Sequence, residues 1–396
     1  MQTDVAAPSQ KRAGPFRILV IFGNIPLWGQ ERGNIQALYA LKEAGHSVLF
    51  VTHRRYGHES IQPALDELGL AWTTGRYPKR FARGMTLKQW RGRLRQAMRG
   101  SKDFLRVARE FQPTHIHVGN EGYLLNLLPV LWALRIPIVF RVGDAPRQHR
   151  PLFRFVWRYL IVPSVSRFVP ISKYIRERLC AVGVPEDSLQ VIYSYPPQHV
   201  SSPSVLPTVA PFKGRTVFYV GQLSKLKGLD VLVEAALGLC STREDVRFII
   251  AGDYAWKNSF AEDLMRRVEE AGLSDRIQFL GFVEEVQDLF SVSDIHVAPS
   301  VFEEPLGNVI LEAKQAGVPS VVFPSGGMPE LLSHRRDGWI CRAKTAASLA
   351  EGIEGLLDLD ETSLDGMKKA AEASLERLGI TPEAFTRAWE ETYASV

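Results

Sequence analysis

The sequence has few cysteines and no long apolar run. Its 396 residues include three cysteines, Cys180, Cys240 and Cys341, which lie far apart. An odd and widely spaced set argues against a disulfide framework or a zinc site and favours a reducing compartment. No uninterrupted apolar run approaches the roughly 20 residues of a membrane-spanning helix. The segment from Met1 to Pro15 lacks the apolar core of a signal peptide, so we expect a loose polar tail on a cytoplasmic protein.

Two motifs are also missing. The first apolar segment is followed by Gly23-Asn24-Ile25-Pro26, which fails the Gly-x-Gly-x-x-Gly pattern and disfavours an NAD-dependent dehydrogenase. No Asp-x-Asp metal motif is evident, so we expect no essential metal. The net charge of +5 is mild, so the distribution of the charges matters more than their sum.

Apolar segments alternate with helical ones along the chain. Phe16–Phe22 (FRILVIF) is almost continuously apolar, as in a parallel strand buried on both faces, and a helical pattern over Ile35–Ala44 follows it. The alternation begins again at Val217, after a stretch rich in Pro, Ser and Val. A chain of this length exceeds one ordinary core. We therefore predict an α/β fold of two doubly wound, Rossmann-like domains that face each other across a cleft.

The predicted organisation has five parts. They are a disordered tail (1–15), a first domain (16–195), a linker (196–211), a second domain (212–375) and a C-terminal helix (376–396) that returns to the first domain. In open sheets of this kind, ligands bind outside the carboxyl ends of the strands. The predicted strands are Phe16–Phe22, Ser47–Thr52, Ile116–Val118, Ile136–Val142, Arg167–Ile171, Val217–Val220, Arg247–Ala251, Ile277–Leu280, Ile295–Ala298 and Ser320–Phe323.

One stretch of the second half combines a strand end, a glycine and two carboxylates. The predicted strand Ile295–Ala298 is followed by Glu304, by Gly307 at the start of a helix, and by Glu312 in its second turn. Backbone N–H groups at such a helix start bind anions, and two glutamates beside them can bind hydroxyl groups that flank a phosphate. The alternative is a plain strand–turn–helix unit, in which the glutamate only complements the helix dipole.

Three other strand ends carry turns of the same kind. Gly221 to Gly228 contains Lys227, a point charge suited to phosphate, just before a helix. Gly281-Phe282 exposes backbone that could pair with a planar base. Ser325 to Glu330 is a third glycine-rich turn. Each of them alone could be a solvated turn, and their order and spacing are more specific.

Together these segments resemble the retaining family 4 glycosyltransferases of the GT-B fold. The resemblance covers about residues 16 to 345. It includes Gly29-Gln30-Glu31-Arg32 and Gly45-His46-Ser47-Val48 in the first half. In the second half it includes the segments Gly221 to Gly228, Gly252-Asp253, Phe279 to Gly281, Glu304 to Glu312, and Gly326 to Glu330.

The resemblance implies roles for the matching residues, with a nucleotide-diphosphate sugar as co-substrate and no other cofactor. The first domain would be the acceptor side and the second would bind the nucleotide sugar. Glu304 would hold hydroxyls of the donor sugar, and Glu312 those of the ribose. Lys227 would bind the diphosphate together with backbone N–H groups of the helix start. The remaining donor-binding residues implied are Gly29, Gly221, Gln222, Phe282, Val283, Gly307, Asn308 and Val309.

Two positions depart from the family pattern. Gln222 stands where the family has arginine, so one positive charge on the diphosphate is missing, and Lys225 could supply it. Gly143-Asp144 stands where the family often has His-Asp. Asp144 is kept as a catalytic candidate beside Glu304 and Lys227.

Basic residues are concentrated in the first half. Such a segment, mixed with aromatic residues, suits an anionic membrane surface or a phosphate-bearing acceptor. The alternative is a solvated helical face with the aromatic residues in the core. No nucleic-acid-binding motif accompanies the charge, so we expect no nucleic-acid partner. The basic residues are Arg76, Lys79, Arg80, Arg83, Lys88, Arg91, Arg93, Arg95, Arg99, Lys102, Arg106 and Arg109, then Arg147, Arg150, Arg154 and Arg158, which alternate with Phe153, Phe155, Trp157 and Tyr159.

The predicted function is transfer of a hexosyl or related sugar, with retention, to a hydroxyl of a lipid-linked, polysaccharide or other acceptor. We expect a role in cell-surface glycan biosynthesis, at the inner face of the membrane. Two alternatives share the architecture: a sugar-nucleotide epimerase, and an inactive protein that binds a sugar nucleotide without turnover.

Overall fold

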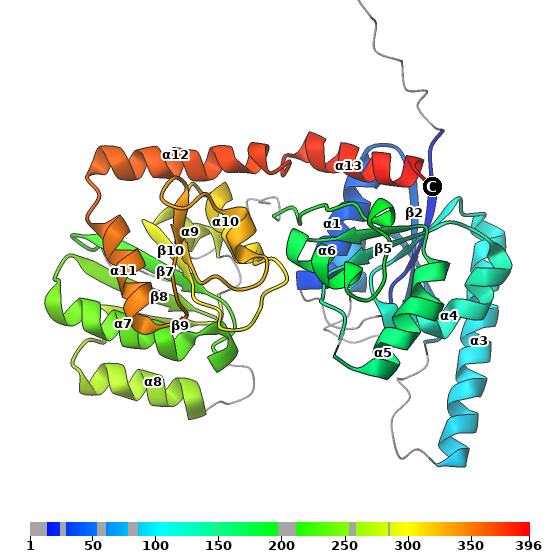
Figure 1. Ribbon diagram of the computed structural model, residues 1–396, viewed down its shortest axis with the longest axis horizontal. Coiled ribbons are helices and arrows are strands. Elements are labelled where there is room, and N and C mark those ends of the chain that lie inside the picture. The colour runs from blue at the N-terminus through cyan, green and yellow to red at the C-terminus, as the bar shows by residue number, and fades with distance from the viewer. Residues whose placement is uncertain are drawn as a thin grey trace, which may run out of the picture.

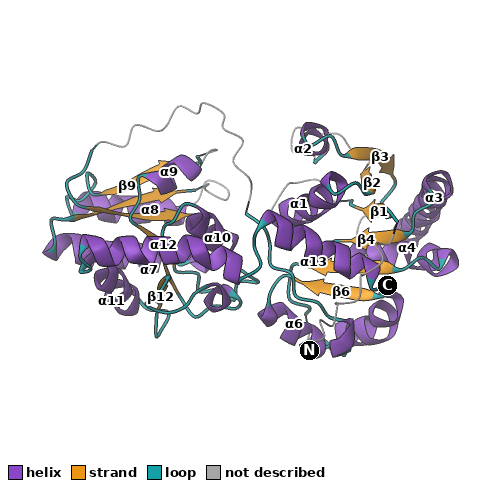
Figure 2. Ribbon diagram, turned by 90° about the horizontal axis from the view of Figure 1, so that it is seen from above, coloured by secondary structure: helices purple, strands orange, loops and turns teal. Residues whose placement is uncertain are grey.

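The computed structural model contains two parallel β-sheets, each enclosed by helices on both faces (Figures 1 and 2). It describes residues 14–23, 29–53, 61–77, 86–147, 149–196, 211–252, 259–283 and 286–396, without the side chains of Leu87 and Trp90. The predicted fold class is confirmed. Nothing tests the predicted domain boundaries, which stay a prediction, and the predicted tail and linker lie almost wholly outside the described residues.

The first sheet has six strands in the order β3-β2-β1-β4-β5-β6. All neighbouring pairs are parallel. The chain therefore moves outward from β1 to β3 and then returns to the other side of β1. The strands are β1 (Arg17–Ile21), β2 (Ser47–His53), β3 (Ala71–Gly75), β4 (His115–Val118), β5 (Ile138–Val142) and β6 (Arg167–Pro170).

The second sheet repeats this order as β9-β8-β7-β10-β11-β12, and it too is fully parallel. In each sheet the order in which the chain adds strands reverses at one point, between β1 and β4 in the first and between β7 and β10 in the second. Such a point opens a crevice at the carboxyl ends of the strands. The strands are β7 (Arg215–Val220), β8 (Val246–Ala251), β9 (Ile277–Gly281), β10 (Ile295–Ala298), β11 (Ser320–Val322) and β12 (Gly338–Ile340).

Helices join the strands and cover both sheets. In the first half they are α1 (Gly29–Glu43), α2 (Gln62–Glu67), α3 (Leu87–Phe111), α4 (Glu121–Leu134), α5 (Pro151–Val156) with a π-helical turn η1 (Trp157–Ile161), and α6 (Lys173–Cys180). In the second half they are the short η4 (Lys225–Lys227), α7 (Leu229–Thr242), α8 (Ser259–Glu270), α9 (Gln287–Ser291), α10 (Asn308–Gln315), η5 (Met328–Leu331), α11 (Ala346–Leu357), α12 (Glu361–Arg377) and α13 (Pro382–Ala394). Within the described ranges, no helix is both long enough and apolar enough to cross a bilayer.

The two last helices connect the two halves. In Figure 1, α12 lies along the second sheet and α13 continues over the first. Phe385, Trp389 and Tyr393 of α13 are buried in one apolar cluster with residues of β1, α1 and β2. The Tyr393 hydroxyl lies 2.6 Å from Nδ1 of His117, a buried β4 side chain. Burial lowers the pKa of His117 to about 3. α13 is thus packed as part of the first half.

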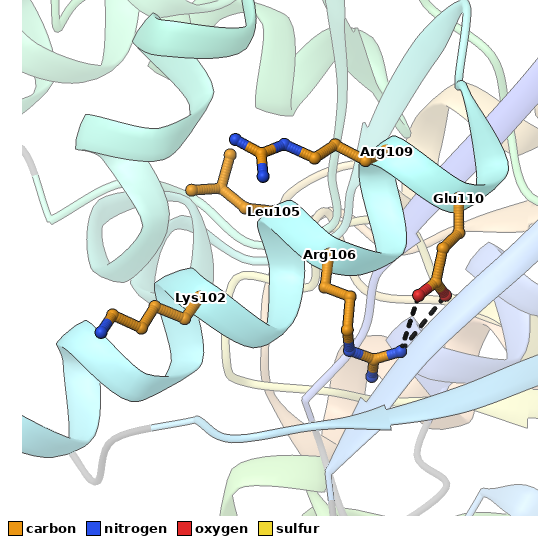
Figure 3. A pocket seen from close by; sticks show the side chains of 5 residues that line it. All are labelled: Lys102, Leu105, Arg106, Arg109 and Glu110. Atoms are coloured by element: carbon orange, nitrogen blue, oxygen red, sulfur yellow. Dashed lines mark hydrogen bonds and ion pairs between the residues drawn. The ribbon is translucent and has the colours of Figure 1, made fainter.

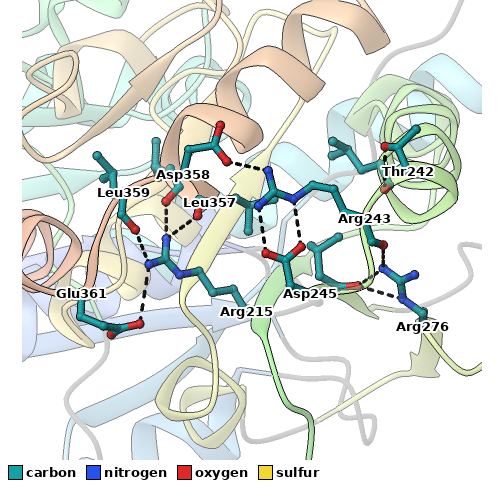
Figure 4. Close-up of polar contacts among 12 residues, drawn as sticks. Arg215, Thr242, Arg243, Asp245, Arg276, Leu357, Asp358, Leu359 and Glu361 are labelled. Carbon is teal, nitrogen blue, oxygen red and sulfur yellow. Dashed lines mark hydrogen bonds and ion pairs between the residues drawn. The ribbon is translucent and has the colours of Figure 1, made fainter.

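A polar cluster fixes the junction between α11 and α12 (Figure 4). Arg243 bridges Asp245 and Asp358, at 2.9 and 2.6 Å, and Asp360 caps α12 by accepting the Ser363 N–H. Asp358-Leu359-Asp360 is an Asp-x-Asp sequence that follows a helix, not a strand. Both of its carboxylates have these structural partners.

Candidate functional site

A glycine turn brings Lys227 to the loop that follows β10. Gly228 has a φ of +74°, and a Cβ there would lie 1.9 Å from the carbonyl oxygen of Pro299, so the turn can approach the strand end only as glycine. The carbonyl of Leu226 accepts the N–H groups of Val301 and Phe302, both at 3.1 Å. The η4 turn and the β10 loop are therefore joined along their backbones, although they are far apart in sequence.

Lys227 and Glu304 form an ion pair at this junction. Lys227 Nζ lies 2.6 Å from Glu304 Oε1, with 35% and 11% of the two side chains exposed. The Ser300 hydroxyl donates to the same oxygen at 2.6 Å. The pair faces a partly desolvated space, where electrostatic interactions are stronger than in water. Sequence reasoning named Lys227 and Glu304 but missed Ser300, whose only signal was its place directly after a strand.

The glycine-rich turn after β11 packs against the backbone of Glu304. Gly327 N donates to the Glu304 carbonyl oxygen at 2.8 Å, and a Cβ at Gly326 would lie 2.0 Å from that oxygen. Gly326 N also donates to Glu303, which is paired with Lys344 at 2.7 Å. These contacts leave no room for a side chain at position 326, and they fix the backbone at Glu304.

The start of α10 lies next to this pair. Gly307 precedes the helix with a φ of +97°, so the first N–H groups of α10, at Asn308 and Val309, follow directly on the Glu304 loop. Glu312 lies one turn further. Burial raises the pKa of its carboxyl group to about 7, and the positive charge of Arg32 on α1 opposes that rise. Sequence reasoning did not assign a role to Arg32.

The first half approaches α10 at the start of α1. A Cβ at Gly29 would lie 3.4 Å from Nδ2 of Asn308, so the predicted phosphate-side glycine lies beside the predicted phosphate-binding helix start. Asp144 follows β5 at the same edge. Its side chain is exposed, yet partial burial raises the pKa of its carboxyl group, and the charge of Glu304 raises that pKa further. The two carboxylates are therefore close enough to interact across the cleft.

Packing against Gln30 explains why position 143 is a glycine. A Cβ there would lie 2.8 Å from Cγ of Gln30, and the Gln30 amide donates to the Gly119 carbonyl oxygen at 2.6 Å. Gln30 therefore occupies the space beside β5 into which a larger side chain at position 143 would extend.

The glycine turns after β7, β8 and β9 are stacked against one another. Gly252 N donates to the Gly281 carbonyl at 2.8 Å, and a Cβ at Gly252 would lie 1.8 Å from the Gly221 carbonyl oxygen. Phe282, directly after Gly281, is 71% exposed. Gln222 is also exposed, and its carbonyl accepts the Tyr219 hydroxyl at 2.9 Å.

A hollow lies elsewhere on the protein. It has a volume of about 400 Å³ and is lined by five residues of the outer helix α3: Lys102, Leu105, Arg106, Arg109 and Glu110 (Figure 3). It is open and one-sided, and Arg106 is paired with Glu110 at 3.1 Å. In the described part of the chain, no group of three or more His, Cys, Asp or Glu side chains could hold a metal ion.

Two family profiles match the chain. Residues 29–194 match "Glycosyltransferase Family 4", and residues 208–373 match "Glycosyl transferases group 1". The chain belongs to glycosyltransferase family 4. The predicted family is thus confirmed, and the two matched ranges contain the Gly29 helix start and the Lys227–Glu304 pair, respectively.

Curated relatives of this family-4 chain match it in part. An uncharacterised glycosyltransferase of Methanocaldococcus jannaschii is 29% identical over 211 residues, which are 50% of this chain and 53% of the relative. The phosphatidyl-myo-inositol mannosyltransferase of Mycobacterium leprae is 27% identical over 261 residues, 63% of this chain and 65% of the relative. The chain spans about half the length of the curated relatives it matches.

Solved structures match over nearly the whole chain. Anabaena HepE in complex with UDP has a TM-score of 0.79 at 19% identity, covering 96% of this chain and 100% of HepE. A glycosyltransferase from Rickettsia africae has a TM-score of 0.79 at 17% identity, covering 97% and 99%. At this identity the likeness establishes the GT-B fold of the family-4 chain.

Proposed function

We propose that this protein is a retaining glycosyltransferase that moves a sugar from a nucleotide-diphosphate sugar to an acceptor hydroxyl. The observation that carries the proposal is the Lys227–Glu304 pair, 2.6 Å apart, beside the glycine-preceded start of α10. A cation, a carboxylate and free helix N–H groups in one place match the phosphate and hydroxyl groups of such a donor. Membership of the family supports the same reaction.

We propose a uridine donor. HepE, which shares the fold, has been solved with UDP and with UDP-glucose. In this arrangement Glu312 accepts the ribose hydroxyls, the N–H groups of Gly307, Asn308 and Val309 bind the diphosphate, and Glu304 accepts hydroxyls of the sugar. Exposed Phe282, with Val283, lies at the strand end where the base would contact the backbone.

In the proposed reaction the bond from the anomeric carbon to the phosphate oxygen breaks, and the acceptor oxygen forms a bond to that carbon from the same side. The acceptor proton passes to the leaving phosphate. Negative charge grows on that phosphate, so Lys227 and the α10 N–H groups stabilise the transition state more than the ground state. We propose that the carboxylates of Glu304 and Asp144 favour positive charge at the reacting carbon.

Transfer of label from UDP-[¹⁴C]glucose into a lipid extract or an oligosaccharide tests this function. We expect Glu304→Gln to lower kcat by about 100-fold or more. Glu269→Gln, an exposed carboxylate on α8, is the matched control and should have wild-type activity. Equal activity of the two variants would contradict the assignment. UDP release that needs no acceptor would favour hydrolysis. Conversion of the nucleotide sugar into an isomer without net UDP release would favour an epimerase, and binding with neither release nor isomerisation would favour an inactive binding protein.

We propose that the acceptor is presented at an anionic membrane surface, near the inner face of the membrane, by α3 and α5. On α3, Leu94 and Met98 are 58% and 57% exposed, one turn apart. They lie among exposed basic side chains: Lys88, Arg91, Arg95 and Arg99. The other basic residues predicted before α3, Lys79, Arg80 and Arg83, lie outside the described residues. Exposed apolar groups flanked by cations favour anionic bilayers.

The aromatic residues around α5 divide between surface and core. Trp157 is 1% exposed and belongs to the core, whereas Phe155 and Tyr159 are 56% and 57% exposed. The interpretation of these aromatics as core residues therefore fits Trp157 and not the other two. Sedimentation with phosphatidylglycerol vesicles at low and high salt tests the surface. We expect binding that salt weakens, and no binding at low salt would contradict the proposal.

A further inference from the structure

The two halves are joined by a carboxylate that crosses between them. Glu330, on η5 of the second half, accepts two backbone N–H groups at the start of α6 in the first half. These are Lys173 N at 2.7 Å from Oε2 and Tyr174 N at 2.6 Å from Oε1. The Tyr193 hydroxyl donates to Oε2 at 3.1 Å. One side chain thus satisfies N–H groups that have no partner within their helix.

A second contact lies beside the first. The Ser172 hydroxyl, which caps α6, donates to the Pro305 carbonyl oxygen at 2.6 Å. A Cβ at Gly327 would lie 3.1 Å from Cβ of Ser172, so the backbone around Gly327 packs directly on the α6 cap. Ile175 of α6 and Met328 of η5 belong to the same buried apolar cluster.

One of the contacts that hold the first half lies in the loop between β10 and α10, which carries Glu304 and which we call the donor loop. Pro305 directly follows Glu304, and Gly327 donates to the Glu304 carbonyl. The first half is therefore held by the backbone that also carries the proposed sugar-binding carboxylate. A negative charge at the start of α6 is also favoured by the helix dipole, so Glu330 fits this place better than a neutral side chain would.

We propose that Glu330 is a positioning residue for the transfer reaction, which sets how closely the first half approaches the donor loop. This proposal rests on the proposed function. When Glu330 holds α6, the side of the cleft with Gly29 and Asp144 faces the donor at a fixed separation. The donor contacts themselves lie in the second half. Loss of Glu330 therefore weakens transfer without weakening binding of the nucleotide.

Three measurements on Glu330→Ala and Glu330→Gln test this role: the Kd for UDP by calorimetry, kcat for sugar transfer, and the radius of gyration from X-ray scattering. We expect the Kd to stay within about twofold of wild type, while kcat falls by about 10- to 100-fold as the reacting groups separate. The radius of gyration should increase. Glu330→Gln keeps one acceptor oxygen and the side-chain shape, so it should fold as wild type and show a smaller effect in the same direction.

The matched control is Glu186→Gln. Glu186 is paired with Arg176 of the same helix α6, at 3.1 Å, but within the first half, so this variant should behave as wild type. A Glu330→Gln variant with wild-type kcat, or with kcat and UDP affinity reduced by the same factor, would overturn the proposal. If the wild-type protein neither binds UDP nor transfers sugar, the proposed function fails. The scattering comparison of Glu330→Gln with wild type then still decides whether Glu330 holds the two halves together.

Discussion

The protonation of Glu312 should control how tightly the protein binds the ribose of the donor. Its pKa of about 7 means that half of the carboxyl groups are protonated at neutral pH. A carboxylate accepts two ribose hydroxyls, whereas a protonated carboxyl must itself donate one hydrogen bond. If only the ionised form binds the ribose, the apparent Kd is inversely proportional to the ionised fraction of Glu312. From pH 8 to pH 6 the affinity should decrease about tenfold, or about 1.4 kcal/mol.

Calorimetry with UDP-glucose measures this dependence. The two phosphates of UDP-glucose are diesters and do not titrate near neutrality, whereas UDP itself would add a proton of its own. Glu312→Gln should bind UDP-glucose more weakly than wild type at pH 8 and should show no dependence on pH. A wild-type Kd that does not change between pH 8 and pH 6 would show that protonation of Glu312 does not control binding of the ribose. An equally steep change in Glu312→Gln would assign the dependence to another group, such as Asp144.

The raised pKa of Glu312 also affects the stability of the free protein. Because the folded-state pKa is above the ordinary value of 4.5, the folded state binds this proton more tightly than the unfolded state. Its free energy of unfolding therefore decreases as the pH rises from about 4.5 to about 7, by up to about 3 kcal/mol. Glu312→Gln should accordingly have a higher Tm than wild type at pH 8 and the same Tm at pH 4.5. Equal Tm values at both pH values would contradict the burial of this carboxylate.

Three further changes test the packing of the Gly228 turn, of α13, and of the buried Lys314–Asp337 pair. Gly228→Ala forces a Cβ to 1.9 Å from a backbone oxygen and should weaken UDP-glucose binding more than about tenfold. The control Gly366→Ala, whose Cβ meets no atom within 4 Å, should bind UDP-glucose as wild type does. Equal affinities of the two variants would contradict the role of the Gly228 turn. Trp389→Ala removes a fully buried side chain of α13 and should lower the free energy of unfolding in urea by about 3–5 kcal/mol. Asp337→Ala leaves the buried Lys314 without its carboxylate and should lower the free energy of unfolding by about 3–5 kcal/mol. Lys314→Met should lower it by less. A larger loss for Lys314→Met than for Asp337→Ala would show that Lys314 is uncharged.

The central strands and two of the four edge strands, β6 and β9, could be predicted from the sequence, and the other two edge strands could not. The strand expected at Ile295–Ala298 is found with the same bounds, because a strand buried on both faces is a continuous apolar run. β3 (Ala71–Gly75) and β12 (Gly338–Ile340) were missed. Each lies at an outer edge of its sheet, and the sequences AWTTG and GWI have no apolar run. Where an edge strand has no apolar run, pairing with its one neighbour determines the strand, and a local pattern does not reveal it.

Some parts of the candidate site could be predicted from local sequence, and others depend on contacts between distant segments. Glu304, Gly307 and Glu312 lie on one strand–turn–helix unit, so their proximity follows from local sequence. The pairing of Lys227 with Glu304 joins positions 77 residues apart and depends on β7 and β10 being neighbours. Glu330 was noticed as part of a glycine-rich turn, but its contact with α6 crosses 157 residues. No periodicity along the chain could indicate that contact.

We propose that the second sheet, and not the first, holds the nucleotide. Both sheets have the same strand order and the same crevice at their carboxyl ends, so the fold alone does not choose between them. A crystal structure of the protein with UDP-glucose tests the choice directly. We predict ribose hydroxyls on Glu312, the diphosphate between Lys227 and the start of α10, and the glucose against Glu304. Nucleotide density in the crevice between β1 and β4, away from Lys227, would contradict the account.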